Sequence, residues 1–250
     1  MNRLPRRTLL SAAMLTLIAA GVAFSHDPTP ESRPSVQAAT SGGAARPASA
    51  EGSVTGKGTA LLIGDSQSGG AAGVGPADTW PQRGLATLGY KVTWVGAGGT
   101  GYVAARGGDH PADNYLRSFQ KQAWKLPSVA PELVVVEGGG NDAGQHRPLD
   151  QVQRNAHLLI QLLKQRYPAS RILVVGVLSK SAAEGGEARL AVDSAAAQAA
   201  RDLHVPFVDP GGWVTRYGLE SRMADGVHLK ASGHSFLTPV FADAVRTALR

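Results

Sequence analysis

The chain alternates short, largely apolar runs with longer segments of helical character from residue 58 to its end. Short apolar runs are typical of strands that are buried on both faces, and they predict strands at 59–64, 91–96, 132–138, 171–177 and 205–210. The intervening segments carry apolar residues at helical spacing or strong helix formers, and they predict helices at 79–90, 114–126, 149–167, 187–203 and 231–249. Strands that alternate with helices form parallel sheets covered by helices. The pattern therefore predicts an α/β fold, a three-layer α/β/α sandwich around a five-stranded parallel sheet.

Residues 1–25 have the pattern of an export signal. Basic residues, among them the adjacent Arg6 and Arg7, precede an uncharged apolar run at 9–24, and small residues allow cleavage after Ser25. The run is shorter than the roughly 18 residues expected of a full membrane span. We expect a signal peptide of the Sec type, or of the twin-arginine type that the two arginines resemble. If the segment is retained, it is a short membrane anchor. Either way the protein is exported, to the periplasm, the cell envelope or the medium.

Residues 26–57 differ in composition from the remainder of the chain. They are rich in Pro, Ser, Ala, Gly and Thr and have almost no large apolar side chain. Such a segment cannot bury enough surface to offset its ordering entropy. We predict a flexible linker that holds a domain at 58–250 away from a membrane or reaches into a cell wall.

Charge and composition exclude several classes of function. The net charge of +6 falls to +3 without residues 1–25, because that segment carries three arginines and no acid, and the rest has no dense Lys/Arg run. We therefore expect no nucleic-acid partner. The absence of cysteine excludes a thiolate metal site and a cysteine nucleophile. No His or carboxylate group has zinc-ligand spacing, and the glycines of 96–101 follow the second strand without the dinucleotide-binding spacing. We predict no metal and no cofactor.

Candidate chemistry follows the predicted strands. Ser66 comes directly after the first strand, a glycine-rich segment follows the second, Asn141 follows the third, and Asp225 and His228 follow the fifth after a longer loop. The carboxyl ends of parallel strands meet at one edge of the sheet, where active sites of such folds lie. A nucleophile, a base, a group to orient the base and donors for an oxyanion would thus meet, which are the parts needed for acyl transfer.

Four motifs in order resemble those of the SGNH hydrolases, the GDSL family of esterases and lipases. They are Gly-Asp-Ser at 64–66, Gly-Gly-Thr-Gly at 98–101, Gly-Gly-Asn-Asp at 139–142 and Asp-Gly-Val-His at 225–228. The resemblance covers nearly all of the chain beyond residue 58 and implies the flavodoxin-like SGNH hydrolase fold. One departure is Gln67, where the family commonly has leucine.

The resemblance and the residue chemistry assign the same three catalytic roles. Ser66 is the predicted nucleophile, and His228 is the predicted base that later protonates the leaving alcohol. Asp225, three residues before His228, is predicted to orient the imidazole. The alternatives are a capping serine, a loop histidine without a role and a turn aspartate. His234 is a weaker rival for the base, because it lies within the last predicted helix and lacks an aspartate at the family spacing.

The predicted oxyanion donors are the backbone N–H groups of Ser66 and Gly99 and the side-chain amide of Asn141. Gly98 is the alternative to Gly99, because the glycine-rich motif can be aligned one position apart. The glycines and Asn141 could also serve only as turns. We expect Asp65 and Asp142, which flank these candidates, to brace their loops by hydrogen bonds.

The sequence therefore predicts an exported serine esterase, with an acyl-enzyme on Ser66, that cleaves O-acyl esters of a carbohydrate, glycolipid or lipid. Its partner would be a small-molecule, polysaccharide or lipid ester, and we expect a monomer. Short acyl chains are favoured because no apolar lid insertion is evident. An acyltransferase that passes the acyl group to a sugar hydroxyl, or a non-catalytic envelope-binding module, are the alternatives.

Overall fold

The computed structural model describes residues 58–250, so the predicted export signal and linker lie outside the described residues. A single parallel sheet has the strand order β2-β1-β3-β4-β5. The strands are β1 (Thr59–Gly64), β2 (Lys91–Gly96), β3 (Leu133–Glu137), β4 (Arg171–Val175) and β5 (Phe207–Val208). This arrangement confirms the predicted five-stranded parallel sheet. All five strands begin at the same edge and end at the opposite edge, where the motifs of the sequence follow them.

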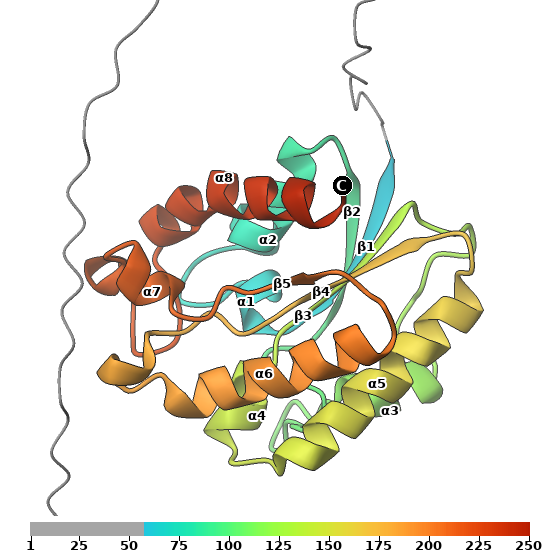
Figure 1. Cartoon of the computed structure of the whole chain (residues 1–250), viewed down its shortest axis with the longest axis horizontal. Coiled ribbons are helices and arrows are strands. Elements are labelled where there is room, and N and C mark those ends of the chain that lie inside the picture. Colours follow the sequence, from blue (N-terminus) through green and yellow to red (C-terminus); the bar gives the residue numbers. More distant parts are fainter. Residues whose placement is uncertain (1–57) are drawn as a thin grey trace, which may run out of the picture. The chain divides into compact units, whose positions relative to one another are not determined.

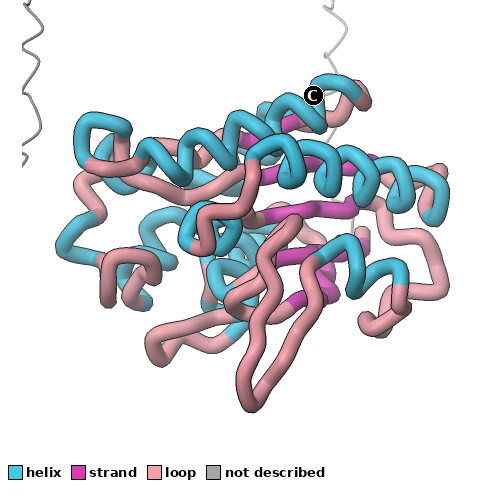
Figure 2. The backbone as a smooth tube through the Cα atoms, turned by 90° about the horizontal axis from the view of Figure 1, so that it is seen from below, coloured by secondary structure: helices cyan, strands magenta, loops and turns pink. Residues whose placement is uncertain are grey.

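Helices cover both faces of the sheet (Figure 1). One face is covered by α2 (Trp80–Thr87) and α8 (Ala231–Ala248), and the other by α3 (Tyr115–Gln120), α5 (Leu149–Arg166) and α6 (Glu187–Asp202). Figure 2 shows the strands enclosed by these helices and by the connecting loops. Short helical turns occur in the loops: α1 (Ser66–Gly69), α4 (Gly140–Gly144), α7 (Trp213–Arg216), η1 (Pro76–Asp78), η2 (Ala182–Glu184) and η3 (Glu220–Arg222). The three-layer α/β/α prediction is confirmed.

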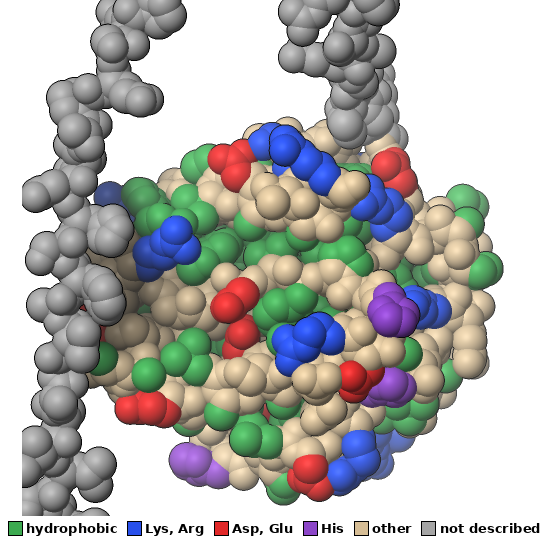
Figure 3. All heavy atoms as spheres, in the orientation of Figure 1, with side chains coloured by type: hydrophobic (Ala, Val, Ile, Leu, Met, Phe, Trp, Pro, Cys, Tyr) green, Lys and Arg blue, Asp and Glu red, His purple; other side chains and the backbone are tan. Residues whose placement is uncertain are grey.

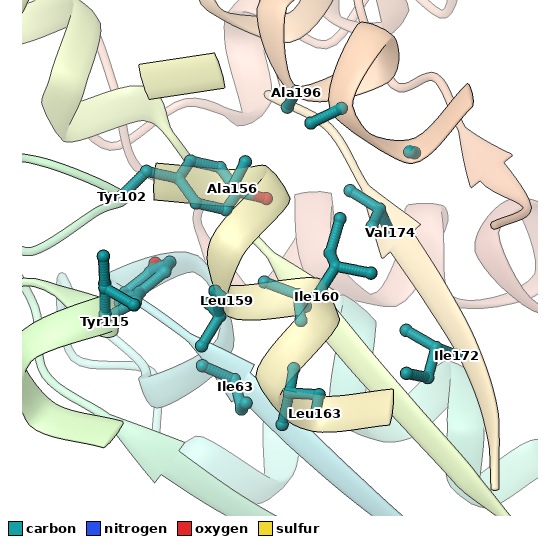
Figure 4. Packing of buried hydrophobic residues seen from close by; sticks show 14 of the residues in the cluster. Ile63, Tyr102, Tyr115, Ala156, Leu159, Ile160, Leu163, Ile172, Val174 and Ala196 are labelled. Carbon is teal, nitrogen blue, oxygen red and sulfur yellow. The ribbon is translucent and has the colours of Figure 1, made fainter. Parts of the chain in front are cut away.

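The core has two halves, one on each face of the sheet. Leu61 and Ile63 of β1 face α5 and α6, whereas Leu62, between them, faces α2 and α8. Figure 4 shows side chains of α5, among them Leu159 and Leu163, gathered around Ile63. Because successive side chains of a strand point to opposite faces, burial on both faces requires an uninterrupted apolar run. This is why the strands read as apolar blocks in the sequence.

The helix predicted at 114–126 is shorter than expected. It ends at Gln120, and Gln122 has a φ of +54°, in the left-handed region that terminates helices. The chain then turns so that Trp124 packs against Tyr115, with ring centroids 6.4 Å apart. The last six residues of the predicted helix, 121–126, are therefore not helical, and Trp124 among them makes a tertiary contact.

Two further observations concern the surface. None of the helices within 58–250 is long and apolar enough to cross a membrane. On the face shown in Figure 3, Lys and Arg side chains are interspersed with Asp and Glu. Charges of opposite sign therefore lie near one another on that face.

Candidate active site

Ser66 lies at the carboxyl end of β1, in the first turn of α1. Asp65 caps this turn, since its Oδ1 accepts a hydrogen bond from the Gln67 backbone N–H at 2.9 Å. The close approach of the turn needs glycine at position 64, because a Cβ there would lie 2.5 Å from Ser68 Oγ. The local sequence therefore ends the strand abruptly and presents Ser66 at the edge of the sheet.

A continuous line of hydrogen bonds joins Ser66 to His228 and Asp225. Ser66 Oγ lies 3.0 Å from His228 Nε2, and His228 Nδ1 lies 2.9 Å from Asp225 Oδ2. A carboxylate can only accept, so Nδ1 carries the proton and Nε2 is left to accept from the serine hydroxyl. Residues separated by 162 positions are thus joined in the order that serine catalysis needs.

The loop at 225–228 is fixed by Asp225 itself. Its Oδ1 accepts hydrogen bonds from the backbone N–H groups of Val227, at 2.7 Å, and His228, at 2.6 Å. The hydrogen bond from the His228 ring and these two backbone bonds lower the pKa of Asp225 to about 2. The carboxylate is therefore ionised at neutral pH and can stabilise a charged imidazole.

His234, the alternative candidate for the base, binds the Trp80 backbone and not Ser66. Its Nδ1 accepts a hydrogen bond from the Trp80 backbone N–H at 3.0 Å, which ties α8 to the start of α2. The side chain is buried, and burial lowers its pKa to about 4. His234 is therefore neutral at pH 7 and occupied in packing.

The candidate oxyanion donors surround Ser66. Ser66 is the first residue of α1, so its own backbone N–H has no acceptor within that helical turn. The N–H groups of Gly98 and Gly99 also have no hydrogen-bond acceptor within residues 58–250. A Cβ on Gly98 would lie 3.4 Å from the Ser66 Cβ, whereas one on Gly99 would meet Arg106 at 3.3 Å. Both glycines thus remain candidates, with Gly98 beside the nucleophile and Gly99 in the left-handed region at φ +81°.

The Asn141 side chain reaches the same place from α4. Its Nδ2 donates to Asp65 Oδ2 and to the Thr100 carbonyl, at 2.9 Å each. Both amide hydrogens are therefore directed at acceptors. To bind an oxyanion, Asn141 must share one of these two amide hydrogens with the substrate.

Asp142 braces the glycine-rich loop. The buried carboxylate accepts hydrogen bonds from the backbone N–H groups of Tyr102, Val103 and Ala104, at 2.9, 2.8 and 2.7 Å. Burial raises the pKa of Asp142, and the three bonds counteract that rise. The loop that follows β2 is in this way attached to the residue next to Asn141.

Gln67 has a role that the sequence did not reveal. Its side chain is buried, and Nε2 donates to the Val227 carbonyl at 2.8 Å while Oε1 accepts from Trp80 Nε1 at 3.4 Å. The residue after Ser66 therefore holds the loop that carries His228. Only the contact across 160 positions shows this, so no sequence signal could have found it.

Asp65 and Glu137 form a buried acidic pair that lines the same cavity as Ser66. Ser68 Oγ donates to the Glu137 carboxyl group, which is almost fully buried at the end of β3. Burial and the nearby charge of Asp65 raise the pKa of Glu137 well above its usual range, and burial raises the pKa of Asp65 to about 6. Two like charges in one buried site resist joint ionisation, so the pair favours a proton on Glu137.

One small cavity adjoins Ser66, and a second cavity adjoins the first. The first is lined by Ser66 and Asn141 and offers about 10 Å³ of room, which corresponds to roughly one water molecule. The second offers about 70 Å³ and shares Leu178, Arg189 and Val227 with the first. Within 58–250 no cluster of three metal-ligating side chains occurs.

Comparison with known proteins decides the family. The model of the GDSL-like lipase/acylhydrolase family matches residues 62–236, a stretch that contains all four motifs. The chain belongs to this GDSL-like family. The suspected SGNH resemblance is thereby confirmed, and this family member is a carboxylic ester hydrolase. A comparison with curated proteins gave no match.

Solved structures of esterases share the fold of this family member. A putative arylesterase from Agrobacterium tumefaciens is 23% identical, with a TM-score of 0.57 over 76% of this chain and 99% of the other. A carbohydrate esterase family 2 enzyme from Corynascus thermopiles is 19% identical, with a TM-score of 0.62 over 78% and 67%. The esterase EstA from Pseudoalteromonas is 14% identical, with a TM-score of 0.58 over 77% and 98%. At these identities the likeness concerns the fold.

Proposed function

We propose that this GDSL-like hydrolase is a serine esterase that cleaves short-chain O-acyl esters through an acyl-enzyme on Ser66. The observation that carries the proposal is the line of hydrogen bonds from Ser66 Oγ through His228 to Asp225, at 3.0 and 2.9 Å. A neutral serine hydroxyl is a weak nucleophile unless an adjacent base removes its proton. In this chain His228 Nε2 is that base.

The reaction has two halves. Ser66 Oγ attacks the ester carbonyl while His228 Nε2 takes the hydroxyl proton, and the ionised Asp225 stabilises the imidazolium that results. The tetrahedral intermediate then collapses, and the imidazolium gives its proton to the leaving alcohol. Water then attacks the acyl-enzyme while His228 Nε2 takes its proton. The second tetrahedral intermediate collapses to release the acid, and the imidazolium returns the proton to Ser66 Oγ.

The developing oxyanion would be bound by the N–H groups of Ser66 and of Gly99 or Gly98, and by the Asn141 amide. Such donors lower the barrier because the charge that they bind forms only during the reaction. Asp65 supports this role because it orients the amide: its Oδ2 accepts a hydrogen bond from Asn141 Nδ2 at 2.9 Å.

The size of the cavity beside Ser66 supports a short acyl chain. Room of about 10 Å³ corresponds to about one water molecule, so the cavity favours a small acyl group over a long one. Acetyl esters are therefore the proposed substrates, and each further methylene requires the walls to move. Overpacking of this kind costs about 1–3 kcal/mol.

We further propose that the alcohol part is a carbohydrate and that the enzyme acts outside the cytoplasm. Two structural neighbours are carbohydrate esterases of family 2, one from Corynascus thermopiles and one from Clostridium thermocellum. The export signal and linker predicted from the sequence would bring the enzyme to a wall polysaccharide or glycolipid. These supports rest on similarity and sequence pattern, and not on a contact in the site.

The test is hydrolysis of 4-nitrophenyl esters of two to eight carbons by the full chain and by Ser66→Ala. We expect kcat/KM to be highest for the acetate and to fall with each added pair of carbons, and we expect the variant to lose activity at least 1,000-fold, as removal of a triad member does in known cases. Activity retained in Ser66→Ala would overturn the mechanism. A maximum at eight carbons would overturn the short-chain assignment. Addition of a sugar acceptor tests for acyl transfer, which would show as an acylated sugar formed in preference to the free acid.

A further inference from the structure

Arg189 is a charged side chain in the site that the ester mechanism does not use. It extends from the first turn of α6, and its Nη1 donates to the Leu178 carbonyl at 3.3 Å. The other four N–H donors of the guanidinium have no acceptor within residues 58–250, and no carboxylate of that range lies within ion-pair distance. The charges of Asp65 and Asp225 act on the half-buried guanidinium from a distance, but neither carboxylate is paired with it, so its remaining donors can reach a ligand.

Arg189 lies close to Ser66, in the lining of the same cavity. It lines the cavity that contains Ser66 and Asn141, and it also lines the adjoining cavity of about 70 Å³. Its Nη1 lies 2.7 Å from where a Cβ on Gly140 would be, so the guanidinium is held against the turn that carries Asn141. Arg189 therefore lies between the cavity that contains Ser66 and the cavity of about 70 Å³, which we call the second chamber.

The second chamber favours negative charge. Lys180 and Arg189 line it, and its lining residues include no Asp or Glu. The remaining lining consists of glycines, apolar side chains and Ser179, whose hydroxyl is already engaged with the Lys180 carbonyl and the Gly212 N–H. Room of about 70 Å³ exceeds the 10–15 Å³ that a single water needs, so a small oxyanion group fits.

We propose that this chamber binds an anionic group of the ester substrate, a carboxylate, sulfate or phosphate, through the guanidinium of Arg189 with Lys180 as a second cation. The inference rests on the proposed esterase function of Ser66. A guanidinium binds such groups by paired, charge-assisted hydrogen bonds. An ester bound with its carbonyl at Ser66 would extend into the chamber past Leu178 and Val227, the other residues common to both cavities.

The experiment compares matched anionic and neutral esters. The probes are 4-acetoxybenzoate, 4-acetoxyphenyl sulfate and 4-acetoxyphenyl phosphate against the neutral 4-acetoxybenzamide. A second pair places the charge on the acyl side, 4-nitrophenyl hemisuccinate against its methyl-capped form. The readout is the ratio of kcat/KM for the anionic ester to that for the neutral one, at pH 8 and constant ionic strength. The three leaving groups distinguish the carboxylate, sulfate and phosphate classes, and the second pair shows which side of the ester enters the chamber.

The variants are Arg189→Gln, Arg189→Lys, Lys180→Gln and, as the matched control, Arg201→Gln. Arg201 is an exposed arginine at the other end of the same helix that bonds only to Gln198 within 58–250. We expect Arg189→Gln to reduce the ratio about 10–100-fold for at least one anionic probe, mainly through KM, as the loss of a charged hydrogen-bonded pair does. Arg189→Lys should restore part of the ratio, Lys180→Gln should reduce it less, and Arg201→Gln should leave it unchanged.

The outcomes separate this inference from the proposed function. A wild-type enzyme that hydrolyses neutral esters but shows no preference for any anionic probe overturns the anion chamber alone. The same holds if Arg189→Gln folds, as judged by its urea midpoint, and lowers neutral and anionic rates equally. A wild-type enzyme that hydrolyses none of the probes overturns the esterase proposal itself.

Discussion

The hydrogen bond from the Gln67 side chain to the Val227 carbonyl, in the loop that carries His228, leads to a specific prediction. Gln67→Met removes both hydrogen bonds of the side chain while it keeps a flexible group of similar length. The Val227 carbonyl then loses its donor at 2.8 Å, and the indole N–H of the fully buried Trp80 loses its acceptor at 3.4 Å. The first loss affects the loop of His228, and the second affects the core beneath α2.

The two losses have different magnitudes. A hydrogen bond of this kind contributes about 1 kcal/mol net, whereas a buried donor left without a partner costs about 1–3 kcal/mol. The thioether that replaces the amide is more apolar and recovers roughly 1 kcal/mol by burial. We expect the free energy of unfolding to fall by about 2 kcal/mol. If the Val227 bond holds His228 in reach of Ser66, its loss lowers kcat by up to about tenfold, since 1.4 kcal/mol corresponds to a factor of ten.

The assay combines urea denaturation, kcat for 4-nitrophenyl acetate and the rate at which a fluorophosphonate labels Ser66. Trp80→Phe is the control, because it removes the indole N–H and leaves the Gln67–Val227 bond in place. We expect Trp80→Phe to lose stability with kcat within about twofold of wild type, and Gln67→Met to lose both kcat and labelling rate. If Gln67→Met lowers the urea midpoint and leaves kcat and labelling unchanged, Gln67 only packs, and the positioning role is refuted.

Three further predictions concern carboxylate and imidazole groups. Asp142→Asn should lower the free energy of unfolding by about 3 kcal/mol, because one charge-assisted hydrogen bond from the 102–104 backbone is lost and the new amide N–H₂ group faces a backbone N–H donor. A loss below about 1 kcal/mol in urea titrations would contradict this. Asp225→Asn should lower kcat by about 10³–10⁴ between pH 6 and 9, because the carboxylate with a pKa of about 2 is ionised throughout and the amide disfavours the required tautomer. His234 is neutral when folded, with a pKa of about 4 against 6.5, so the unfolded chain binds its proton first and stability falls as pH drops from 6.5 to 4. The loss amounts to about 3 kcal/mol. His234→Asn keeps an acceptor for the Trp80 backbone N–H and should abolish this pH dependence in urea titrations at pH 4 to 7. Equal pH dependence in both proteins would refute the assignment.

Much of the fold could be predicted because its signals are local. Burial of β1 on both faces requires the continuous apolar run at 60–63, and the end of that run fixes where Ser66 lies relative to the sheet. The helix at 114–126 was the weaker prediction. Its sequence pattern suits a helix, but the helix ends at Gln120 and Trp124 packs against Tyr115 from the segment beyond it.

The sequence by itself determined the layered fold, the family and the four motifs, because each depends on the order and spacing of nearby residues. Only the tertiary structure decided how the site is assembled. It brings His228 to Ser66 across 162 positions, gives His234 a packing role, and directs both amide hydrogens of Asn141 at acceptors. It also places Gln67 against the loop that carries His228, and Arg189 in the lining of the cavity beside Ser66. Such contacts join residues far apart along the chain, and their side-chain directions follow from packing, which no local pattern records.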